Sequence, residues 1–131
     1  MKIKTGLILC AGFGKRVQPI TDTLPKPLIV YKNITLLENT INFLIKLKID
    51  KIKINVFYLK DQITSFVKNK NFPVNIEIID DGETILGTGG GILNLIKSSE
   101  ENDALVINPD TIWDNSYISS INKMEEIYFK K

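Results

Sequence analysis

The feature that most constrains the fold of this chain is a regular alternation of short apolar runs with segments of helical periodicity. Four runs rich in branched and aromatic residues predict strands, at residues 4–10, 52–58, 74–79 and 104–108. Between and after them, helices are predicted at residues 36–47, 61–70, 92–97 and 116–128. Thr35 and Glu38 have the spacing of a capping box at the start of the first helix. The order βαβαβαβ predicts an α/β fold, a three-layer, Rossmann-like, mostly parallel sheet with helices on both faces.

The bulk composition fits one globular domain over residues 1–131. Hydrophobic residues make up 44% of the chain and charged residues 24%, which suffices for one modest core. The net charge of +2 comes from 17 basic and 15 acidic residues scattered along the chain, so no nucleic-acid partner is indicated. No apolar run has the length of a membrane span, and the single cysteine, Cys10, fits a reducing compartment. We therefore expect a cytoplasmic protein without a membrane partner.

The absence of histidine narrows the chemistry that the chain can perform. It excludes Ser-His-Asp and Cys-His nucleophiles and the usual zinc sites. Carboxylates, lysine, arginine, backbone amides and a hard metal ion remain. Phosphoryl and nucleotidyl transfers need little more than these groups, because positioning and charge neutralisation do most of the work.

Three unusual segments follow the carboxyl ends of predicted strands. They are a long loop at residues 9–30, a glycine-rich loop at residues 80–91, and Asp110 after Pro109. In parallel α/β sheets, ligands bind beyond the carboxyl ends of the strands. We therefore expect the three segments to share one rim of the sheet and to form one site.

The long loop, LCAGFGKRVQPITDTLPKPLIV, has the ingredients of a phosphate cradle but fits neither common phosphate motif. Val17 stands where a dinucleotide fingerprint needs its third glycine, and Arg16 stands where a Walker A loop needs serine or threonine. The small residues before Lys15 let a ligand approach the backbone, and Lys26 lies between two restricting prolines. These residues alone leave open a second interpretation, a mobile turn with a solvated Lys-Arg pair.

The other two segments also allow two interpretations each. The glycine-rich residues 87–90 either contact a ligand through their backbone or form a helix N-terminus packed closely on the sheet. For Asp80, Asp81 and Glu83, we expect a solvated acidic turn rather than ligand contacts. Asp110 is either a cap or turn residue or a metal ligand, and its place at a strand end favours the metal.

Three motifs, in this order and spacing, make the chain resemble the sugar-1-phosphate nucleotidyltransferases over residues 3 to about 115. The long loop matches the family signature L-A-A-G-x-G-x-R-x-x-P-x-T-x-x-x-P-K-P at nearly every fixed position, with Cys10 replacing an alanine. The segment LGTGGGI at residues 86–92 resembles the base-binding loop of that family, and VINPDTIWD at residues 106–114 resembles its metal-binding segment.

The resemblance implies an enzyme in which a sugar-1-phosphate oxygen attacks the α-phosphorus of a nucleoside triphosphate, releasing pyrophosphate and forming an NDP-sugar. It implies that Arg16 neutralises the triphosphate, that Lys26 contacts the phosphate of the sugar-1-phosphate or the α-phosphate, and that Asp110 binds Mg²⁺. The nucleotide-binding residues implied are Leu9, Ala11, Gly12, Gly14, Lys15, Gly87, Thr88, Gly89 and Gly90. No general base is required, because the nucleophile is already an anion.

Within the family, the TGGGI and N-x-D-T-I-W segments are most similar to N-acetylmuramate-α-1-phosphate uridylyltransferases, which recycle cell-wall sugars. This similarity favours UTP with N-acetylmuramate-1-phosphate over GTP with mannose-1-phosphate. The chain also departs from the family, since Pro109 stands where a small residue usually precedes the metal-binding aspartate.

The chain is truncated relative to the family, whose members are usually nearly twice as long. Their second half supplies further strands, much of the sugar pocket and a second metal-binding aspartate. Besides a minimal enzyme, two alternatives therefore follow. One is a truncated nucleotide-binding remnant, and the other is a half-enzyme completed by homo-oligomerisation or by a separately encoded C-terminal half.

Overall fold

The computed structural model describes residues 2–12, 18–82, 87–97 and 103–130. Its main sheet has four parallel strands in the order β5-β4-β1-β6. The strands are β1 (Thr5–Leu9), β4 (Lys51–Val56), β5 (Asn75–Asp80) and β6 (Leu105–Ile107). The helices are α1 (Leu36–Lys46), α2 (Lys60–Lys70), α3 (Gly87–Lys97) and α4 (Ser116–Phe129). The predicted α/β class and the alternation of strands and helices are confirmed.

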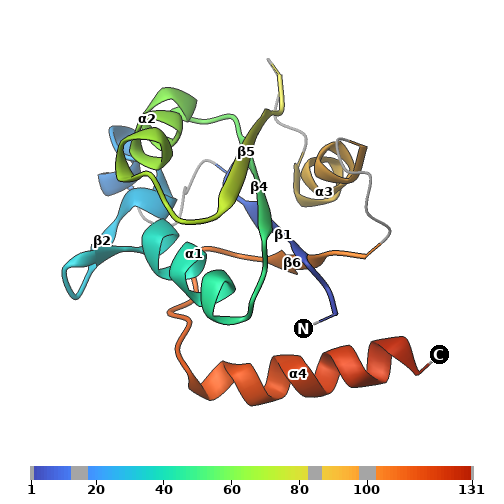
Figure 1. Ribbon diagram of the computed structural model, residues 1–131. Coiled ribbons are helices and arrows are strands. Elements are labelled where there is room, and N and C mark those ends of the chain that lie inside the picture. The colour runs from blue at the N-terminus through green and yellow to red at the C-terminus, as the bar shows by residue number, and fades with distance from the viewer. Residues whose placement is uncertain (1, 13–17, 83–86, 98–102, 131) are drawn as a thin grey trace.

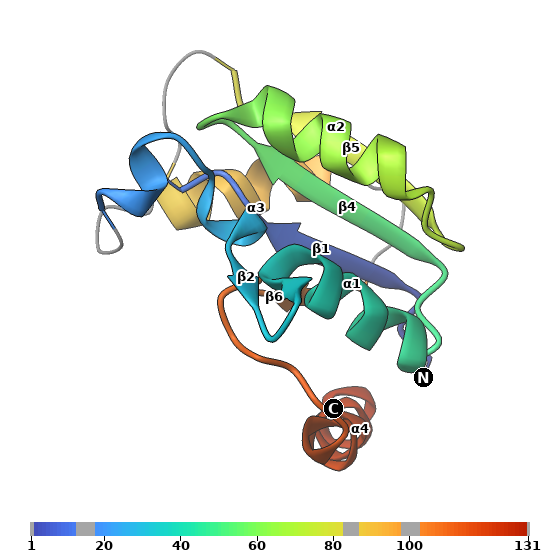
Figure 2. The same ribbon diagram turned by 90° about the vertical axis from the view of Figure 1, so that its left-hand side faces the viewer.

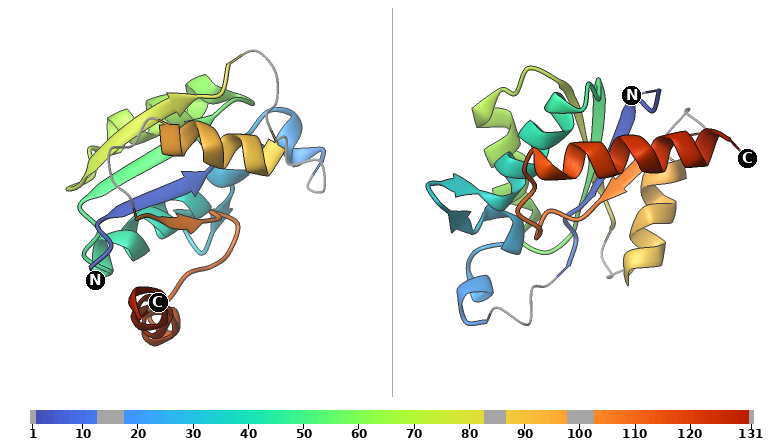
Figure 3. Two further views of the ribbon diagram at one scale, coloured as in Figure 1. Left: turned by 90° about the vertical axis from the view of Figure 1, so that its right-hand side faces the viewer. Right: turned by 90° about the horizontal axis from the view of Figure 1, so that it is seen from below.

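The helices cover both faces of the sheet, as predicted. Figures 1 and 2 show α1 and α2 on one face, and Figure 3 shows α3 on the other. One glycine on each face shows how closely a helix approaches the sheet. A Cβ atom on Gly6 would lie 2.9 Å from a methyl carbon of Leu44 in α1, whereas one on Gly91 in α3 would lie 2.6 Å from Asn55 Nδ2. Both helices therefore pack closely on the sheet.

The core lies mainly between the sheet and the helices α1 and α2. Ile8, Ile52 and Ile54 of adjacent strands are fully buried there, and their side chains meet Leu37, Ile41 and Leu44 of α1 in one apolar cluster. The helix cap predicted at the start of α1 is present, since Thr35 Oγ1 accepts a hydrogen bond of 3.0 Å from the Glu38 amide, while the Glu38 carboxylate pairs with Lys70 at 3.1 Å. This cap fixes where α1 begins after the long loop.

The described later part of the long loop, from residue 18, contains local structure that the sequence prediction did not include. Two 3₁₀ turns, Ile20–Asp22 and Lys26–Leu28, interrupt it, and it ends in a small antiparallel hairpin of β2 (Val30–Tyr31) and β3 (Ile34–Thr35). Lys32 and Asn33 form the hairpin turn with positive φ angles of 52° and 69°. The sequence prediction missed this hairpin, although asparagine in a two-residue turn is a recognisable signal for it.

The last helix, α4, joins the two ends of the described chain. Its Glu125 carboxylate accepts hydrogen bonds from the Lys2 and Ile3 amides, at 3.0 and 2.9 Å. Figure 3 shows α4 lying beyond β6, outside the layers formed by the other helices. Among the described residues, no helix combines the length and apolar character required to cross a membrane.

Candidate nucleotide-binding site

The carboxyl ends of all four parallel strands lie at one rim of the sheet. Cys10 follows β1, Asp81 follows β5, and Asn108 follows β6, so the three segments singled out in the sequence start from the same rim. The strand order places β1 between β4 and β6, and the connections leave β1 toward β4 and return later to β6. This is the switch point at which α/β sheets bind ligands.

The first loop leaves this rim with its backbone accessible. Ala11 is buried, whereas Gly12 is exposed, and a Cβ atom built on Gly12 meets no atom within 4 Å. Leu9, the last residue of β1, is half-buried. Gly14, Lys15 and Arg16, which we predicted as nucleotide-binding or catalytic, lie outside the described residues.

The far part of the first loop is anchored on the turn between β4 and α2. The Tyr58 hydroxyl donates a hydrogen bond of 2.6 Å to the Thr21 carbonyl, and Gln62 Nε2 donates one of 2.8 Å to the Thr23 carbonyl. Pro25 and Pro27 are both buried beside Lys26, so their restricted φ angles hold the lysine backbone. These contacts bring the far part of the loop, with Lys26, back to the rim.

Lys26 and Asp110 form an ion pair across the site. Lys26 Nζ lies 3.1 Å from Asp110 Oδ2, although the two residues are 84 positions apart in the chain. Both side chains keep part of their surface in solvent, with exposed fractions of 32% for Lys26 and 44% for Asp110. The structure thus brings together a predicted phosphate-contacting lysine and the predicted metal-binding aspartate.

The segment that carries Asp110 is fixed by an aromatic cluster. The Trp113 ring stacks on Phe43 with ring centroids 5.4 Å apart, and its Nε1 donates a hydrogen bond of 2.9 Å to the Asn108 carbonyl. Trp113 therefore packs the segment against α1. Asp114 instead accepts hydrogen bonds from the Ser116 amide and hydroxyl at the start of α4, and the side-chain hydrogen bond from Ser116 lowers the pKa of Asp114.

The carboxylate of Asp110 is an oxygen donor of the kind that Mg²⁺ prefers. Asp110 Oδ2 pairs with Lys26, while nearly half of the side chain stays exposed at the rim. Within the described ranges, no group of three or more acidic, cysteine or histidine side chains could form a protein-only metal cage. Mg²⁺ is commonly bound by one or two carboxylates together with substrate phosphates and water, so a single exposed carboxylate suits it.

The second glycine-rich segment differs from the prediction. Residues 80–91 were expected as a loop before a helix at residues 92–97, but α3 already begins at Gly87, and the glycines form its first turns. Tertiary packing explains the difference, because Gly91 lies directly against Asn55, where a Cβ atom would clash. Gly87, Thr88, Gly89 and Gly90 thus stand at the N-terminal end of a helix that packs on the sheet.

Asp81, one of the three acidic residues before α3, is not part of a solvated turn, whereas Asp80 is exposed. Asp81 is 8% exposed, and its two carboxylate oxygens accept hydrogen bonds from Asn55 and Asn94. The sequence prediction failed here because the partners that satisfy this buried charge come from β4 and α3, far away in the sequence. Glu83, the third member of the predicted turn, lies outside the described residues.

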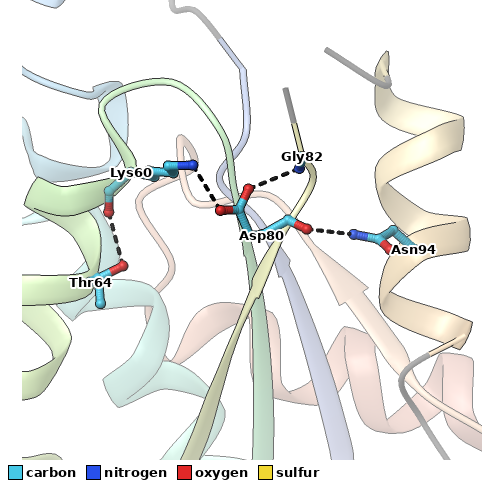
Figure 4. A network of polar contacts seen from close by, with 5 residues as sticks. All are labelled: Lys60, Thr64, Asp80, Gly82 and Asn94. Carbon is cyan, nitrogen blue, oxygen red and sulfur yellow. Dashed lines mark hydrogen bonds and ion pairs between the residues drawn. The ribbon is translucent and has the colours of Figure 1, made fainter. Parts of the chain in front are cut away.

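Asp80 ties together the two helices that flank β5, as Figure 4 shows. Its carboxylate accepts hydrogen bonds of 2.8 Å from Lys60 at the start of α2 and from the Gly82 amide, while Asn94 of α3 reaches its carbonyl at 3.4 Å. The hydrogen bond from Lys60, followed by that from Gly82, lowers the pKa of Asp80. The end of β5 is thus a polar junction of α2 and α3.

Fold and rim together define a class of protein, the α/β proteins that bind their ligands at the carboxyl end of a parallel sheet. A family model described as nucleotidyl transferase matches residues 5–129. The chain belongs to the nucleotidyl transferase family.

Known relatives agree with this membership. The chain is 36% identical over 120 residues to "Bifunctional protein GlmU" of Methanococcus aeolicus, an alignment that covers 88% of this chain and 27% of the relative. It is 29% identical over 113 residues to "N-acetylmuramate alpha-1-phosphate uridylyltransferase" of Caulobacter vibrioides, covering 84% of this chain and 47% of the relative. The crystal structure of HddC from Yersinia pseudotuberculosis superposes with a TM-score of 0.79 at 27% identity, covering 92% of this chain and 54% of that one.

The coverage is unequal in every one of these comparisons. Most of this chain is matched, but it spans between about a quarter and about half of the relatives' own lengths. The fold and family described above therefore concern the portion of the family that carries the first loop, the second glycine-rich segment and Asp110.

Proposed function

We propose that the chain is the nucleotide-binding part of a sugar-1-phosphate nucleotidyltransferase, which makes an NDP-sugar and pyrophosphate from a nucleoside triphosphate and a sugar-1-phosphate. The observation that carries the proposal is the ion pair between Lys26 and Asp110 at the rim beside the first loop. A cation for phosphate and a carboxylate for a hard metal are the two charges that this transfer needs within reach of one phosphorus. We assign the reaction to the cytoplasm.

Different residues of the chain would bind the nucleotide, stabilise charge and hold the metal ion. The backbone of Leu9, Ala11 and Gly12 would hold the nucleotide near the end of β1, where Gly12 leaves open space. Lys26 would leave Asp110 and bind a phosphate oxygen, stabilising negative charge in the transition state. Asp110 would hold Mg²⁺, which would supply positive charge to offset the negative charge of the phosphates. Gly14, Lys15 and Arg16 keep the nucleotide-binding and catalytic roles proposed from the signature.

For the substrates, we propose UTP and N-acetylmuramate-1-phosphate, with GTP and a mannose-type sugar phosphate as the second choice. The relative from Caulobacter vibrioides supports the first pair by its name. A relative from Aneurinibacillus thermoaerophilus named D-glycero-alpha-D-manno-heptose 1-phosphate guanylyltransferase, also 29% identical, supports the second. The TGGGI segment, residues 88–92 at the start of α3, favours UTP, and the base would be contacted by Gly87, Thr88, Gly89 and Gly90.

The test is pyrophosphate release with Mg²⁺, with UTP, GTP and dTTP each combined with N-acetylmuramate-, N-acetylglucosamine-, glucose- and mannose-1-phosphate. Release in one combination is expected to fall at least a hundredfold in Lys26→Ala, because the variant loses one charged transition-state contact. Lys68→Ala, at an exposed lysine in the last turn of α2, is the matched control and should keep full activity. Equal activity of Lys26→Ala and Lys68→Ala would refute the role of Lys26.

The second candidate is a nucleotide-binding part that does not turn over by itself, either a remnant or one half of a split enzyme. It is favoured by the coverage, since this chain matches only 54% of the HddC chain. It predicts that the chain binds Mg·UTP or Mg·GTP in calorimetry but releases no pyrophosphate in any combination. Addition of a polypeptide that supplies the remaining half of the family fold should then restore release for a split enzyme and leave a remnant inactive.

A further inference from the structure

Asn55 is a buried polar side chain that the proposed chemistry does not use. It is the next-to-last residue of β4, it is 2% exposed, and it points toward α3 rather than toward the apolar core under α1 and α2. Its Oδ1 accepts a hydrogen bond of 2.8 Å from the Cys10 amide, and its Nδ2 donates one of 3.0 Å to Asp81 Oδ2. The Cys10 amide can only donate, so it fixes the orientation of the Asn55 carboxamide.

Asp81 continues this chain of hydrogen bonds to α3. Its second carboxylate oxygen, Oδ1, accepts a hydrogen bond of 2.8 Å from Asn94 Nδ2, and its amide donates one of 2.9 Å to the Val56 carbonyl. A buried carboxylate is costly unless its oxygens are satisfied, and here each oxygen has an amide donor. A fully satisfied buried network of this kind fixes one arrangement of the elements that it joins.

The network joins the two segments that would hold the nucleotide. At one end, Cys10 directly precedes Ala11 and Gly12 of the first loop. At the other end, Asn94 belongs to α3, and Gly91 of the same helix rests on the Asn55 amide, where an added Cβ atom would be 2.6 Å away. One side chain, Asn55, therefore contacts the start of the first loop and the body of α3.

We propose that Asn55 and Asp81 are positioning residues that set the spacing between the first loop and the glycine-rich start of α3. They would not touch the nucleotide. They would instead hold the phosphate-binding and base-binding segments at the separation that one nucleoside triphosphate spans. The ligand part of this inference rests on the proposed function, whereas the coupling of the two segments is a property of the protein alone.

An exchange of the two side chains tests the proposal. Asn55→Asp places a second carboxylate against Asp81 and removes the donor, while the Cys10 amide keeps its acceptor. In the double variant Asn55→Asp/Asp81→Asn, the carboxylate introduced at position 55 would accept from both the Cys10 amide and the carboxamide introduced at position 81. The carbonyl oxygen of that carboxamide would accept from Asn94. The double variant thus restores every donor–acceptor pair and the net charge of the wild type.

Two readouts separate positioning from loss of stability. Hydrogen exchange of the free protein at pH 8 reports the Cys10 amide and the amides of residues 91–95. Calorimetry with Mg·UTP and Mg·GTP reports the dissociation constant. Asn55→Asp is expected to accelerate exchange at both places together and to weaken nucleotide binding at least tenfold, and the double variant should return both values to within about threefold of wild type. Ile54→Val, a core change at the adjacent residue of β4, controls for stability alone and should leave the dissociation constant unchanged.

Each outcome decides the matter. If Asn55→Asp exchanges and binds like the wild type, or if the double variant is no better than the single one, the positioning role is wrong. If the wild type binds neither nucleotide, the proposed function is wrong. Hydrogen exchange then still tests whether the first loop and α3 are coupled. If Asn55→Asp does not fold, Asp81→Asn is compared with the double variant, which should again be the closer to wild type, and the opposite order would refute the proposal.

Discussion

One buried hydroxyl on β1 is unsatisfied. Thr5 is 1% exposed, and its Oγ1 has no hydrogen-bond partner among the described residues. A buried polar atom without a partner loses its bonds to water and gains nothing in return. The threonine at position 5 thus lowers the free energy of unfolding relative to an apolar residue of the same shape.

Thr5→Val should therefore stabilise the protein. Valine has the same shape and the same preference for strands, but it removes the unsatisfied oxygen. We expect the free energy of unfolding to rise by about 1 kcal/mol, measured by urea denaturation. Thr64→Val is the control, because Thr64 is exposed and its hydroxyl donates to the Lys60 carbonyl, so no gain is expected there. A loss of stability in Thr5→Val would mean that the hydroxyl has a partner in solution.

Asp80 should make the stability of the protein depend on acid pH. Its pKa is lowered in the folded state by the hydrogen bonds from Lys60 and the Gly82 amide. A lowered pKa means that the stabilisation is fully present above the ordinary pKa of aspartate, about 3.9, and is lost as pH falls below it. The free energy of unfolding of the wild type should thus fall as pH falls through this range. That of Asp80→Asn should fall by a smaller amount.

Thermal denaturation between pH 2.5 and 7 would measure this effect. Asp61→Asn, at an exposed aspartate in the first turn of α2, is the control and should follow the pH dependence of the wild type. A pH dependence of Asp80→Asn identical to that of the wild type would contradict the role given to the Lys60 contact.

At the level of elements, two glycines of the rim have different surroundings. Gly91 of α3 is needed for packing, since an added Cβ atom would lie 2.6 Å from Asn55 Nδ2, whereas Gly12 of the first loop has open space around it. A glycine that can accept a side chain without a clash has no packing reason to be glycine. Gly12 is therefore the better candidate for close approach of a ligand.

Replacement of each of these two glycines by alanine should separate an effect on packing from an effect on ligand binding. Gly91→Ala should lower the free energy of unfolding by about 1–3 kcal/mol through overpacking, although alanine favours helices. Gly12→Ala should change it by less than about 0.5 kcal/mol and instead weaken binding of Mg·UTP or Mg·GTP in calorimetry. If Gly12→Ala binds the nucleotide as well as the wild type, then the first loop does not approach the phosphates through that residue.

The elements themselves could be predicted from the sequence, because local patterns determine them. The apolar runs of β1, β4 and β5 and the Thr35 cap of α1 correspond to observed elements within one or two residues. The start of α3 was placed five residues too late, because glycine is a poor helix former and the packing that overrides this preference is not local. The burial of Asp81 was missed for the same reason, since Asn55 and Asn94 come to it from other elements.

For the molecule as a whole, the parallel direction of the strands and the position of the rim followed from the alternation of elements and the rules for parallel crossovers. From the sequence, Lys26 and Asp110 could be expected only to lie at the same rim. Their ion pair could not be predicted, because the distance between them depends on how the long loop folds back. The burial of Lys53 could not be predicted from the sequence. Its side chain is 1% exposed within β4 and pairs with Glu77 at 3.4 Å. A lysine in a strand gives no sign in the sequence of whether it is buried.

The packing of Trp113 has a practical consequence for optical spectroscopy. It is the only tryptophan of the chain, and it lies three residues after Asp110, stacked on Phe43 and close to Tyr117, with ring centroids 4.9 Å apart in the latter pair. Its emission therefore reports on the segment that carries the carboxylate of the site. Titration with magnesium and nucleotide can be followed by the tryptophan fluorescence of the unlabelled protein, excited at wavelengths that its four tyrosines do not absorb.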